Sequence, residues 1–455
     1  MLLFLPDALI NSLRQLKSFN EETFKNVHSS GQPLTSVRYN PAKHFEIEDS
    51  LLHIHDSVPW CPFGRYLTER PFFTFDPLLH AGAYYVQEAS SMFLWHALAQ
   101  TVGRNTKGLK VLDLCAAPGG KSTLLASYFT DGFIVANEVI RQRANILAEN
   151  ITKCGAANTA ITNNDPKNFT SLTNYFDVIV VDAPCSGSGL FRKEPQAINE
   201  WSESNVELCS QRQQRILADV YPALKKDGIL IYSTCSYSAE ENEDILKWMS
   251  KAFAVCSLKL EVEADWGIIE TVTENNNYGY RFFPDKVKGE GFFIAALKKT
   301  DGESSHQHYS VSITSPSKNE IASCEMIVKR QADLFYFKQV ENIIAIPARW
   351  KEDIGLLQKK LYLRKAGITV GALKGKDMVP NHELALSSLL NENVPGIPLK
   401  YEDALLYLKK KEFIADHTTK GWTIVAYKGL ALGWLKVLHN RINNYYPTEW
   451  RILKD

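Results

Sequence analysis

The sequence predicts an α/β protein whose central element is a doubly wound parallel β-sheet. Between residues 109 and 299, short apolar runs rich in Val, Ile and Leu alternate with helical stretches. Such runs are typical of strands that are buried on both faces of a sheet. A glycine-rich turn follows the first run, and a cysteine-containing block follows each of two later runs. Strands that alternate with helices indicate βαβ units, which build parallel sheets.

Five strands are expected in this part of the chain, at residues 109–115, 133–138, 159–165, 176–184 and 228–236. Helical patterns between them predict helices at 121–129 and 141–152. Gly155 follows the second pattern and is a plausible helix stop. Two further apolar segments, at 280–283 and 291–298, are separated by a turn and predict an antiparallel hairpin at the edge of the sheet.

Length and composition place the chain among ordinary globular proteins with several domains. At 455 residues it is too long for one core, and its 45% hydrophobic and 22% charged residues are typical of soluble proteins. No stretch approaches the roughly 20 apolar residues that span a bilayer. The first residues have no basic region, and their apolar run stops at Pro6, so a signal peptide is not expected. We therefore expect a cytoplasmic protein without a membrane partner.

Eight cysteines are present, and none of them forms a C-x-x-C pair. That spacing disfavours a zinc site, so no metal is expected. A disulfide framework is also disfavoured in a long chain without a secretion signal. Most of these thiols are expected to be small buried hydrophobic groups.

The charge is distributed unevenly, although the net charge is +0. Residues 326–455 contain 21 Lys and Arg against 13 Asp and Glu, so this third is basic and the remainder is acidic. A basic C-terminal third suits docking to RNA. A solvated basic face would give the same charge count, and charge alone does not separate the two.

A polar stretch divides the chain after the sheet. Residues 300–320 are Ser-rich and without apolar periodicity, which predicts a linker. Beyond it lies a second globular region that ends in an aromatic, small-residue stretch from 421 to 434, which we expect to be a small β-rich unit.

The turn after the first strand is a candidate cofactor site. Residues 111–122 (VLDLCAAPGGKS) leave the strand and open a helix, where small residues let a ligand approach the backbone and the helix N-terminus adds a positive dipole end. The turn is neither a Walker A loop nor a G-x-G-x-x-G motif, which disfavours ATP and NAD. The residues expected to line the ligand are Cys115, Ala116, Ala117, Pro118, Gly119, Gly120 and Lys121.

Acidic residues follow successive strands. Glu138 ends the second strand, where an acid can bind ribose hydroxyls. Asp165 ends the third strand and could accept a hydrogen bond from an adenine amino group. Such carboxylates can also be helix caps. Together with Asp113 at the end of the first strand, however, three acids at three strand ends favour S-adenosylmethionine as the ligand.

Three blocks of the sequence carry a resemblance to a known family. DLCAAPGGKS, DAPCSGSGLFRK and YSTCSYSAEENE resemble the signature blocks of the Nol/Nop/Sun RNA cytosine-5 methyltransferases. Residues 80–92 resemble the block that this family carries before its catalytic sheet, and residues 36–41 and 59–61 resemble its N-terminal RNA-binding region. The tail at 443–451 resembles the PUA-like end of the RsmF (YebU) type, a bacterial 16S ribosomal RNA methyltransferase. The resemblance spans nearly the whole chain and is weakest between Thr300 and Pro395.

The resemblance implies a division of the chain. The expected core is a class I (Rossmann-like) S-adenosylmethionine methyltransferase domain at 76–299, preceded by an N-terminal RNA-binding region at 1–75. A linker at 300–325, an intermediate region at 326–395 and an α+β PUA-like RNA-binding domain at 396–455 follow. The chain departs from the family at Pro284-Asp285, where the family usually reads Pro-His.

The resemblance also implies a mechanism. Carbon 5 of cytosine is a poor nucleophile, but a thiolate that adds at carbon 6 makes the ring enamine-like, and the C5 proton must later leave together with the thiolate. By resemblance, Cys235 is the nucleophile and Cys185 assists product release, an order that the residues alone leave open. Both are expected at one crevice, since they follow neighbouring strands.

Four further side chains are expected to take part. Asp182 is placed to bind the cofactor and to hydrogen-bond the amino edge or N3 of the cytosine, and Lys121 to orient the base and favour a nearby thiolate. Arg192 and Lys193 are candidate RNA phosphate contacts. A solvated basic pair is an equally good interpretation of the last two.

Four other functions are consistent with parts of this pattern. A tRNA substrate would fit the same blocks. A DNA cytosine-5 methyltransferase works with the single thiol of its Pro-Cys block, so the second block, Thr-Cys-Ser, favours RNA. An N-methyltransferase would show Asn/Asp-Pro-Pro-Tyr in place of Asp-Ala-Pro-Cys. A non-catalytic ribosome-assembly factor is disfavoured because both cysteines are present. We therefore expect a monomeric enzyme that methylates 16S ribosomal RNA.

Overall fold

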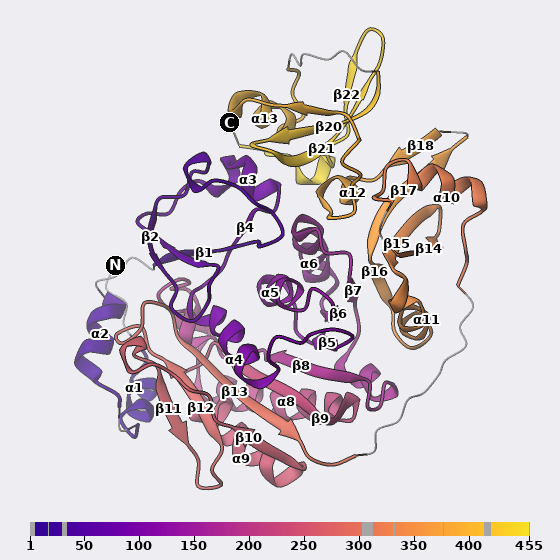
Figure 1. Ribbon diagram of the computed structural model, residues 1–455. Helices are drawn as coiled ribbons and strands as arrows, with labels where there is room; N and C mark the ends of the chain where they lie inside the picture. Colours follow the sequence, from indigo (N-terminus) through magenta and orange to yellow (C-terminus); the bar gives the residue numbers. More distant parts are fainter. Residues whose placement is uncertain are drawn as a thin grey trace.

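The computed structural model describes residues 5–16, 18–29, 34–302, 313–330, 333–375, 377–413 and 420–454. Within these residues, the centre of the molecule is a ten-stranded mixed sheet (Figure 1). Its strand order is β11-β12-β13-β9-β8-β5-β6-β7-β16, with β10 paired to β13.

The parallel part of this sheet has the five strands that the sequence predicts. They are β5 (Lys110–Asp113), β6 (Phe133–Asn137), β7 (Thr159–Thr162), β8 (Phe176–Asp182) and β9 (Leu224–Thr234). Their pairings, β6–β7, β5–β6, β5–β8 and β8–β9, are all parallel. The direction of winding reverses between β5 and β8, which creates the crevice where sheets of this type bind ligands.

Helices cover both faces of the sheet, which confirms the doubly wound fold class. Helices α4 (Phe93–Thr101) and α5 (Gly120–Tyr128) pack on one face. Helices α8 (Glu203–Val220) and α9 (Glu243–Ala252) pack on the other. Helix α6 (Arg141–Cys154) lies beside α5 and ends at Gly155, which has a φ of 79° as a left-handed cap requires. A short helix α7 (Ala197–Glu200) precedes α8.

The predicted antiparallel hairpin is present as β12 (Tyr278–Phe282) and β13 (Phe292–Lys299). It joins the parallel part through the pairing of β13 with β9. The hairpin is not the outermost element, however, because β11 (Ile269–Val272) pairs with β12 and β10 (Val255–Leu258) pairs with β13.

The N-terminal region consists of two helices and a small sheet. Helices α1 (Asp7–Leu13) and α2 (Glu21–Ser29) pack in one apolar cluster with Tyr237 and Phe283. The sheet has the order β2-β3-β1-β4, and its strands are β1 (Thr35–Tyr39), β2 (Ile54–Ser57), β3 (Gly64–Leu67) and β4 (Tyr84–Val86). The boundary expected at residue 75 therefore falls inside this region, because β4 and the preceding helix α3 (Pro77–His80) belong to it.

The family departure at Asp285 has a definite place in this arrangement. The side chain of Asp285 accepts a hydrogen bond of 2.7 Å from Thr23 Oγ1 in α2. This contact ties the N-terminal helices to the loop between β12 and β13.

Part of the predicted linker at 300–325 is helical. Residues 303–312 lie outside the described part of the chain, whereas residues 318–325 form helix α10 (Lys318–Glu325). Ser317 and Glu320 form a capping box at its start. This S-x-x-E pattern is typical of a helix start, but the polar composition of the segment led to the prediction of a linker.

The intermediate region is joined to the catalytic sheet. Its own sheet has the order β14-β15-β17-β18, and β16 extends the central sheet by pairing antiparallel with β7. The elements are β14 (Leu334–Gln339), β15 (Asn342–Pro347), α11 (Lys351–Lys360), β16 (Leu363–Ala366), β17 (Ile368–Lys374), β18 (Asp377–Pro380) and α12 (His382–Leu386). The region therefore covers one edge of the central sheet, at the right in Figure 1.

The C-terminal unit confirms the small β-rich region expected there. Its sheet has the order β19-β20-β21-β22, from β19 (Gly396–Pro398), β20 (Gly421–Tyr427), β21 (Leu430–Val437) and β22 (Ile442–Asn444), with helix α13 (Tyr401–Leu408). It shares an apolar cluster with the N-terminal sheet. The side chains of His80 and Tyr446 meet across this contact, with 3.2 Å between Nδ1 and the hydroxyl oxygen.

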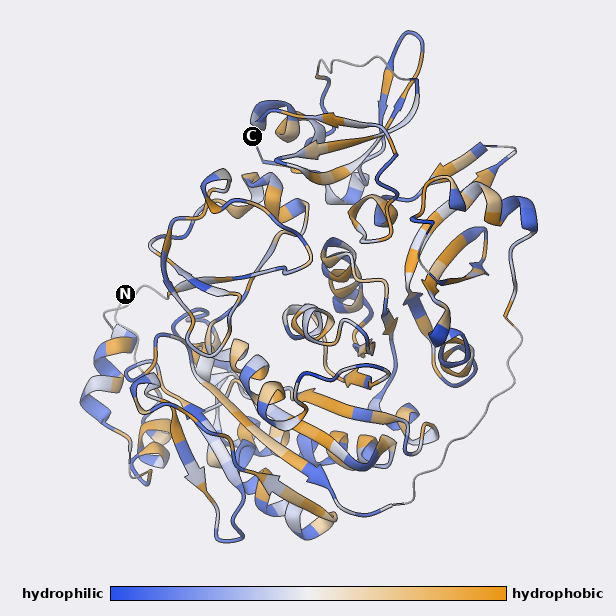
Figure 2. Ribbon diagram, viewed as in Figure 1, coloured by the Kyte–Doolittle hydropathy of each residue, from blue (hydrophilic) through white to orange (hydrophobic). Residues whose placement is uncertain are grey.

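Apolar residues concentrate in the strands at the centre, while the outer faces of the helices are hydrophilic (Figure 2). Among the described helices, none is long and apolar enough to cross a membrane.

A substitution at Trp350 tests how strongly its packing on the central sheet stabilises the protein. It is 3% exposed and stacks on Phe133 of β6, with ring centroids 5.2 Å apart. We expect Trp350→Ala to lower the free energy of unfolding by about 3 to 5 kcal/mol, the usual cost of truncating a buried aromatic side chain. Phe72→Ala is the matched control, because Phe72 is 78% exposed, and it should have little effect. Urea unfolding followed by circular dichroism measures both, and equal stabilities for the two variants would contradict this packing.

Candidate functional site

The glycine-rich turn lies at the C-terminal end of β5, beside the point where the winding of the sheet reverses. Gly119 has a φ of 117°, a conformation that favours glycine, and Gly120 begins α5. Side chains of α6 hold the turn from outside: Arg143 donates to the carbonyl of Ala117 at 2.7 Å, and Asn150 donates to that of Pro118 at 2.8 Å. The turn is thus fixed with the helix N-terminus directed at the crevice.

The predicted acids at the strand ends differ in burial. Glu138 is 2% exposed and directly follows β6. Its carboxylate accepts from the backbone N–H of Ile140 at 2.9 Å and lies 3.4 Å from Arg143. Asp165 follows β7 by three residues, is 44% exposed and caps a 3-10 helix through the N–H of Lys167. The alternative interpretation of such carboxylates, a helix cap, therefore applies to Asp165. This role leaves a contact with a ligand possible through its exposed oxygen.

Asp113 completes this group at the end of β5. Its side chain is 0% exposed, and one oxygen accepts from Ser122 Oγ at 2.6 Å. Its other oxygen has no hydrogen-bond partner among the described residues. Burial raises the pKa of Asp113 to about 7. A buried carboxyl group with a free acceptor position beside the turn suits a polar ligand group.

The two predicted cysteines meet at the ends of adjacent strands. β8 pairs in parallel with β9, with Asp182 opposite Ser233, and the chain continues from these residues into Cys185 and Cys235. Their Sγ atoms are 2.8 Å apart, and both are free thiols. The hydrogen bond with Cys235, followed by burial, raises the pKa of the Cys185 thiol well above its ordinary value.

Lys121 and Asp182 form an ion pair beside these thiols. The distance between Lys121 Nζ and Asp182 Oδ2 is 2.7 Å, and Ser233 Oγ donates to the other oxygen of Asp182, also at 2.7 Å. Burial acts to lower the pKa of Lys121, but the charge and hydrogen bond of Asp182 outweigh it and leave this pKa above its ordinary value. The ammonium group also lies 5.2 Å from the centre of the Phe292 ring.

The two residues predicted to contact phosphate lie in different environments. Lys193 is exposed, as a phosphate contact requires. The side chain of Arg192 is only 6% exposed, and it forms an ion pair of 3.5 Å with the buried Glu290. Neither a surface phosphate contact nor a solvated basic face describes Arg192, because its charge is already matched inside the protein. We correct that expectation to a structural ion pair.

The structure adds two residues that sequence reasoning did not select. Arg38 of β1 is buried and donates to Thr123 Oγ1 at 2.7 Å and to the Gly120 carbonyl at 3.3 Å, so the N-terminal sheet contacts the start of α5. Glu241 is buried between the two cysteine loops. Both stand inside motifs used for the family resemblance, and that position in the sequence was the only available signal.

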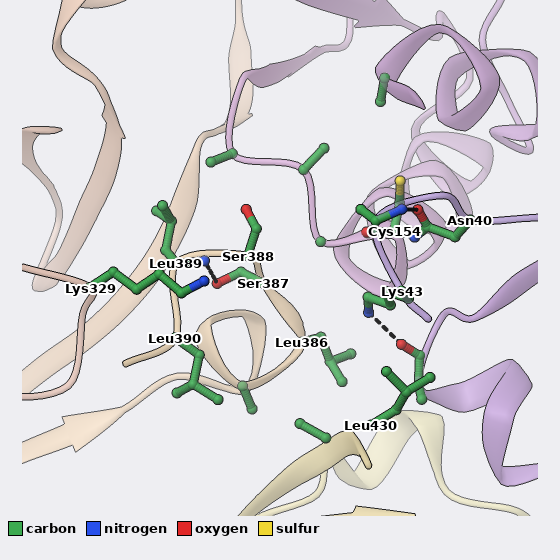
Figure 3. Close-up of a pocket in the computed structure, with 18 of the residues that line it drawn as sticks. Asn40, Lys43, Cys154, Lys329, Leu386, Ser387, Ser388, Leu389, Leu390 and Leu430 are labelled. Atoms are coloured by element: carbon green, nitrogen blue, oxygen red, sulfur yellow. Dashed lines mark hydrogen bonds between the residues drawn. The ribbon is translucent and has the colours of Figure 1, made fainter. Parts of the chain in front are cut away.

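A separate cavity of about 770 Å³ lies where the four regions of the protein meet (Figure 3). Asn40 and Lys43 of the N-terminal region line it together with Cys154 at the end of α6, opposite the loop at 386–390 and Leu430. None of the site residues predicted from the sequence lines it. In the described part of the chain, no group of three or more His, Cys, Asp or Glu is placed to hold a metal ion.

Comparisons with known proteins agree with this arrangement. The family model described as 16S rRNA methyltransferase RsmB/F matches residues 102–298. The model of the N-terminal domain of 16S rRNA methyltransferase RsmF matches residues 5–89, and that of the methyltransferase RsmF PUA domain matches residues 395–452.

Two solved structures are similar in fold. A methyltransferase homolog protein from Pyrococcus horikoshii is 28% identical, with a TM-score of 0.52, over 65% of this chain and 100% of that chain. NSun6 from Pyrococcus horikoshii, solved with SFG, has a TM-score of 0.54 over 66% of this chain and 100% of that chain. Since the second is only 19% identical, it shows the fold alone.

Relatives with assigned names extend the similarity to the whole chain. The ribosomal RNA small subunit methyltransferase F of Aliivibrio fischeri (strain ATCC 700601 / ES114) is 30% identical, with 98% of each chain covered. That of Psychromonas ingrahamii is 31% identical over 86% of this chain and 85% of its own. With the methyltransferase sheet, the N-terminal region and the PUA domain all matched, this chain belongs to the RsmF family of 16S ribosomal RNA methyltransferases.

Proposed function

We propose that this protein is an S-adenosylmethionine-dependent RNA (cytosine-5) methyltransferase that acts on 16S ribosomal RNA through a covalent bond between Cys235 and carbon 6 of the base. The observation that carries the proposal is the pair of free thiols 2.8 Å apart at the ends of β8 and β9, beside the ion pair of Lys121 and Asp182. The names of the relatives favour ribosomal RNA over the tRNA alternative.

S-Adenosylmethionine, the methyl donor in this proposal, fits the residues of the crevice. No side chain caps the start of α5, so its first backbone N–H groups are left for a ligand, and the unpartnered oxygen of Asp113 supplies an acceptor. In the proposed arrangement, Glu138 would hold the ribose hydroxyls and Asp165 the adenine amino group, and Lys121 and Asp182 would complete the site.

The first step forms a covalent bond to RNA. The Cys235 thiolate adds its electron pair to carbon 6 of cytosine, and the electrons of the C5=C6 bond move into the ring. Asp182 supports this step by accepting a hydrogen bond from the amino group of the base or from its protonated N3, which favours the electron-poor form of the ring. S-Adenosylmethionine held in this crevice would supply an electrophilic methyl group to carbon 5 and would keep the electron pair of its own carbon–sulfur bond.

The second step releases the product. A base removes the C5 proton, the C5=C6 bond reforms, and the bond from carbon 6 to Cys235 breaks so that the thiolate returns. Cys185 is close enough to act here, because its sulfur lies next to that of Cys235. Cys185 thus assists release from a position beside the carbon–sulfur bond that breaks.

The charges around the thiols support different roles for them. Asp182 is the main cause of the raised pKa of Lys121, and the Cys235 sulfur adds to it, so the ammonium group lies within electrostatic reach of Cys235. The carboxylate of Glu241, by contrast, contributes to the raised pKa of Cys185. This asymmetry favours Cys235 as the nucleophile and a protonated Cys185 in the resting enzyme.

The remaining features of the proposal concern the partner and setting. The basic residues 326–455, which include the PUA domain, dock the RNA through its phosphates, and the exposed Lys193 adds a contact near the site. We further propose a monomeric, metal-independent enzyme in the cytoplasm. A non-catalytic assembly factor that binds the same RNA is the second candidate.

The proposal is tested by methyl transfer from labelled S-adenosylmethionine to unmodified 16S ribosomal RNA, alone and in small subunits. We expect 5-methylcytosine with the wild-type protein and none above background with Cys235→Ala, because this variant lacks the thiol proposed to attack carbon 6. Among the described cysteines, no other thiol contacts Cys185 at the strand ends and could replace it. Cys256→Ala, which changes an exposed cysteine, is the matched control and should leave activity unchanged. Full activity of Cys235→Ala would refute the assigned nucleophile, and absence of transfer by the wild-type protein would favour the assembly factor.

Cys185→Ala should give a different result from Cys235→Ala. Attack by Cys235 remains possible, whereas release is impaired, so methylated RNA should accumulate in a covalent complex that survives denaturing electrophoresis. The double variant with Cys235→Ala should abolish that complex. Normal turnover of Cys185→Ala without a trapped complex would remove Cys185 from the mechanism.

Glu138→Ala should weaken binding of S-adenosylmethionine by ~1 to 3 kcal/mol, because ligand hydroxyls would lose a charged acceptor. Isothermal titration calorimetry measures this directly. Asp165→Asn should cost less, since Asp165 is 44% exposed and Asn preserves the helix cap. Glu207→Ala, at an exposed position of α8 on the opposite face, is the control. Unchanged affinity for Glu138→Ala would exclude the proposed ribose contact.

A further inference from the structure

The carboxylate of Glu241 lies between the two loops that carry the reactive thiols. Glu241 is 0% exposed and belongs to a single turn of 3-10 helix that follows β9. Ser186 directly follows Cys185, and Ser236 directly follows Cys235. Both serines are hydrogen-bonded to this one carboxylate.

Four donors converge on the two oxygens of Glu241. One oxygen accepts from the backbone N–H of Ser186 at 2.7 Å and from Gln213 Nε2 at 3.3 Å. The other accepts from the hydroxyls of Ser186 and Ser236, each at 2.5 Å. A carboxylate has acceptor positions for all four donors, and burying it is costly unless they are filled. The bridge therefore resists separation of the two loops.

The bridge is anchored to the frame of the enzyme on two sides. Tyr232 of β9 donates from its hydroxyl to the backbone carbonyl of Glu241 at 2.6 Å. Gln213 belongs to α8 and also donates to the carbonyl of Pro184 at 3.1 Å. These contacts thus hold both loops in a fixed position relative to the central sheet and to helix α8, which packs on it.

We propose that Glu241 is a positioning residue that holds Cys185 and Cys235 at a fixed separation, so that one sulfur bonds carbon 6 while the other assists release. The inference rests on the proposed function and adds to it a residue that touches neither cofactor nor base. Its reason is geometric. Cys235 forms the bond to carbon 6 and Cys185 assists its breaking, so both sulfur atoms must stay within a small range of positions around the same ring. A misplacement of 1 Å can lower the rate about 100-fold.

The test compares two substitutions at this position. Glu241→Ala removes the bridge, and we expect kcat for 5-methylcytosine formation to fall about 100-fold. The dissociation constant for S-adenosylmethionine should stay within about twofold, because the Glu241 carboxylate makes none of its hydrogen bonds to the turn or to the acids proposed to hold the cofactor. Glu241→Gln keeps an oxygen for Ser186 and offers an amide N–H₂ to the two hydroxyls, so it should recover most of the activity. Glu240→Ala, at the exposed neighbouring position, is the matched control.

A second readout follows bond formation alone. In a Cys185→Ala background, which traps RNA on Cys235, Glu241→Ala should slow the appearance of the covalent complex, a rate that a loss of general stability would leave unchanged in folded protein. If Glu241→Ala does not fold, Ser186→Ala removes only one hydroxyl from the bridge and should still lower kcat.

The outcomes separate the two proposals. Wild-type kcat for folded Glu241→Ala, or for Ser186→Ala where that variant must serve, would overturn the positioning role. A Glu241→Gln variant as slow as Glu241→Ala would also overturn it, since the charge and not the bridge would then matter. If the wild-type protein methylates RNA at another atom, the proposed function fails, whereas the same comparison of kcat on that product still decides the role of Glu241.

Discussion

The site depends on the parallel pairing of β8 with β9. This register sets Asp182 opposite Ser233 and carries Cys185 and Cys235, which are 50 residues apart in the chain, to a sulfur separation of 2.8 Å. Because hydrogen bonds along the ladder fix the register, a slip by one residue would turn every side chain of one strand to the other face. Two further contacts hold the same alignment. The hydroxyl of Ser233 donates a hydrogen bond to the carboxylate of Asp182 at the end of the ladder, and Glu241 bridges the two loops beyond it.

The other regions of the chain complete and protect this sheet. β16 covers its edge at β7, which would otherwise expose unpaired backbone groups. The N-terminal sheet contacts the start of α5 through Arg38, and it shares an apolar cluster with the C-terminal unit. The regions that the family resemblance associates with RNA are therefore packed on the catalytic domain in the described structure, so RNA held by them would lie against the same body as the crevice.

The charged side chains near the two cysteine blocks have different surroundings. Lys121 with Asp182 places an ammonium group near Cys235, whereas Glu241 adds negative charge near Cys185. Arg192 with Glu290 is buried a short distance along the chain from the cysteine block, and burial raises the pKa of Glu290 to about 7 despite its partner. A basic residue next to a reactive motif can thus be part of the interior, and only its burial separates that role from a contact with RNA.

Much of the fold and of the site could be predicted from the sequence, because local chemistry determines those features. Few conformations suit an apolar run of strand length, a glycine after a helical pattern such as Gly155, or a glycine-rich turn such as 115–120. The five parallel strands and the position of the crevice could therefore be predicted from these features. The two cysteines and Glu138 are predictable as site residues because residues at the ends of parallel strands share one edge of a sheet. Their chemical roles rest on the family resemblance and on the proposed reaction.

Other features depend on contacts between residues far apart in the chain, which no local pattern encodes. Residues 363–366 joined the central sheet rather than their own region, Arg192 was buried against Glu290, and Glu241 connected the two cysteine loops. In each case the partner lies about 50 to 200 residues away or on another element, so its identity is decided by packing. The sequence alone determined which chemistry the chain can support and on which strands. The tertiary structure alone decided which charges are matched inside the protein, because burial and distance set that balance.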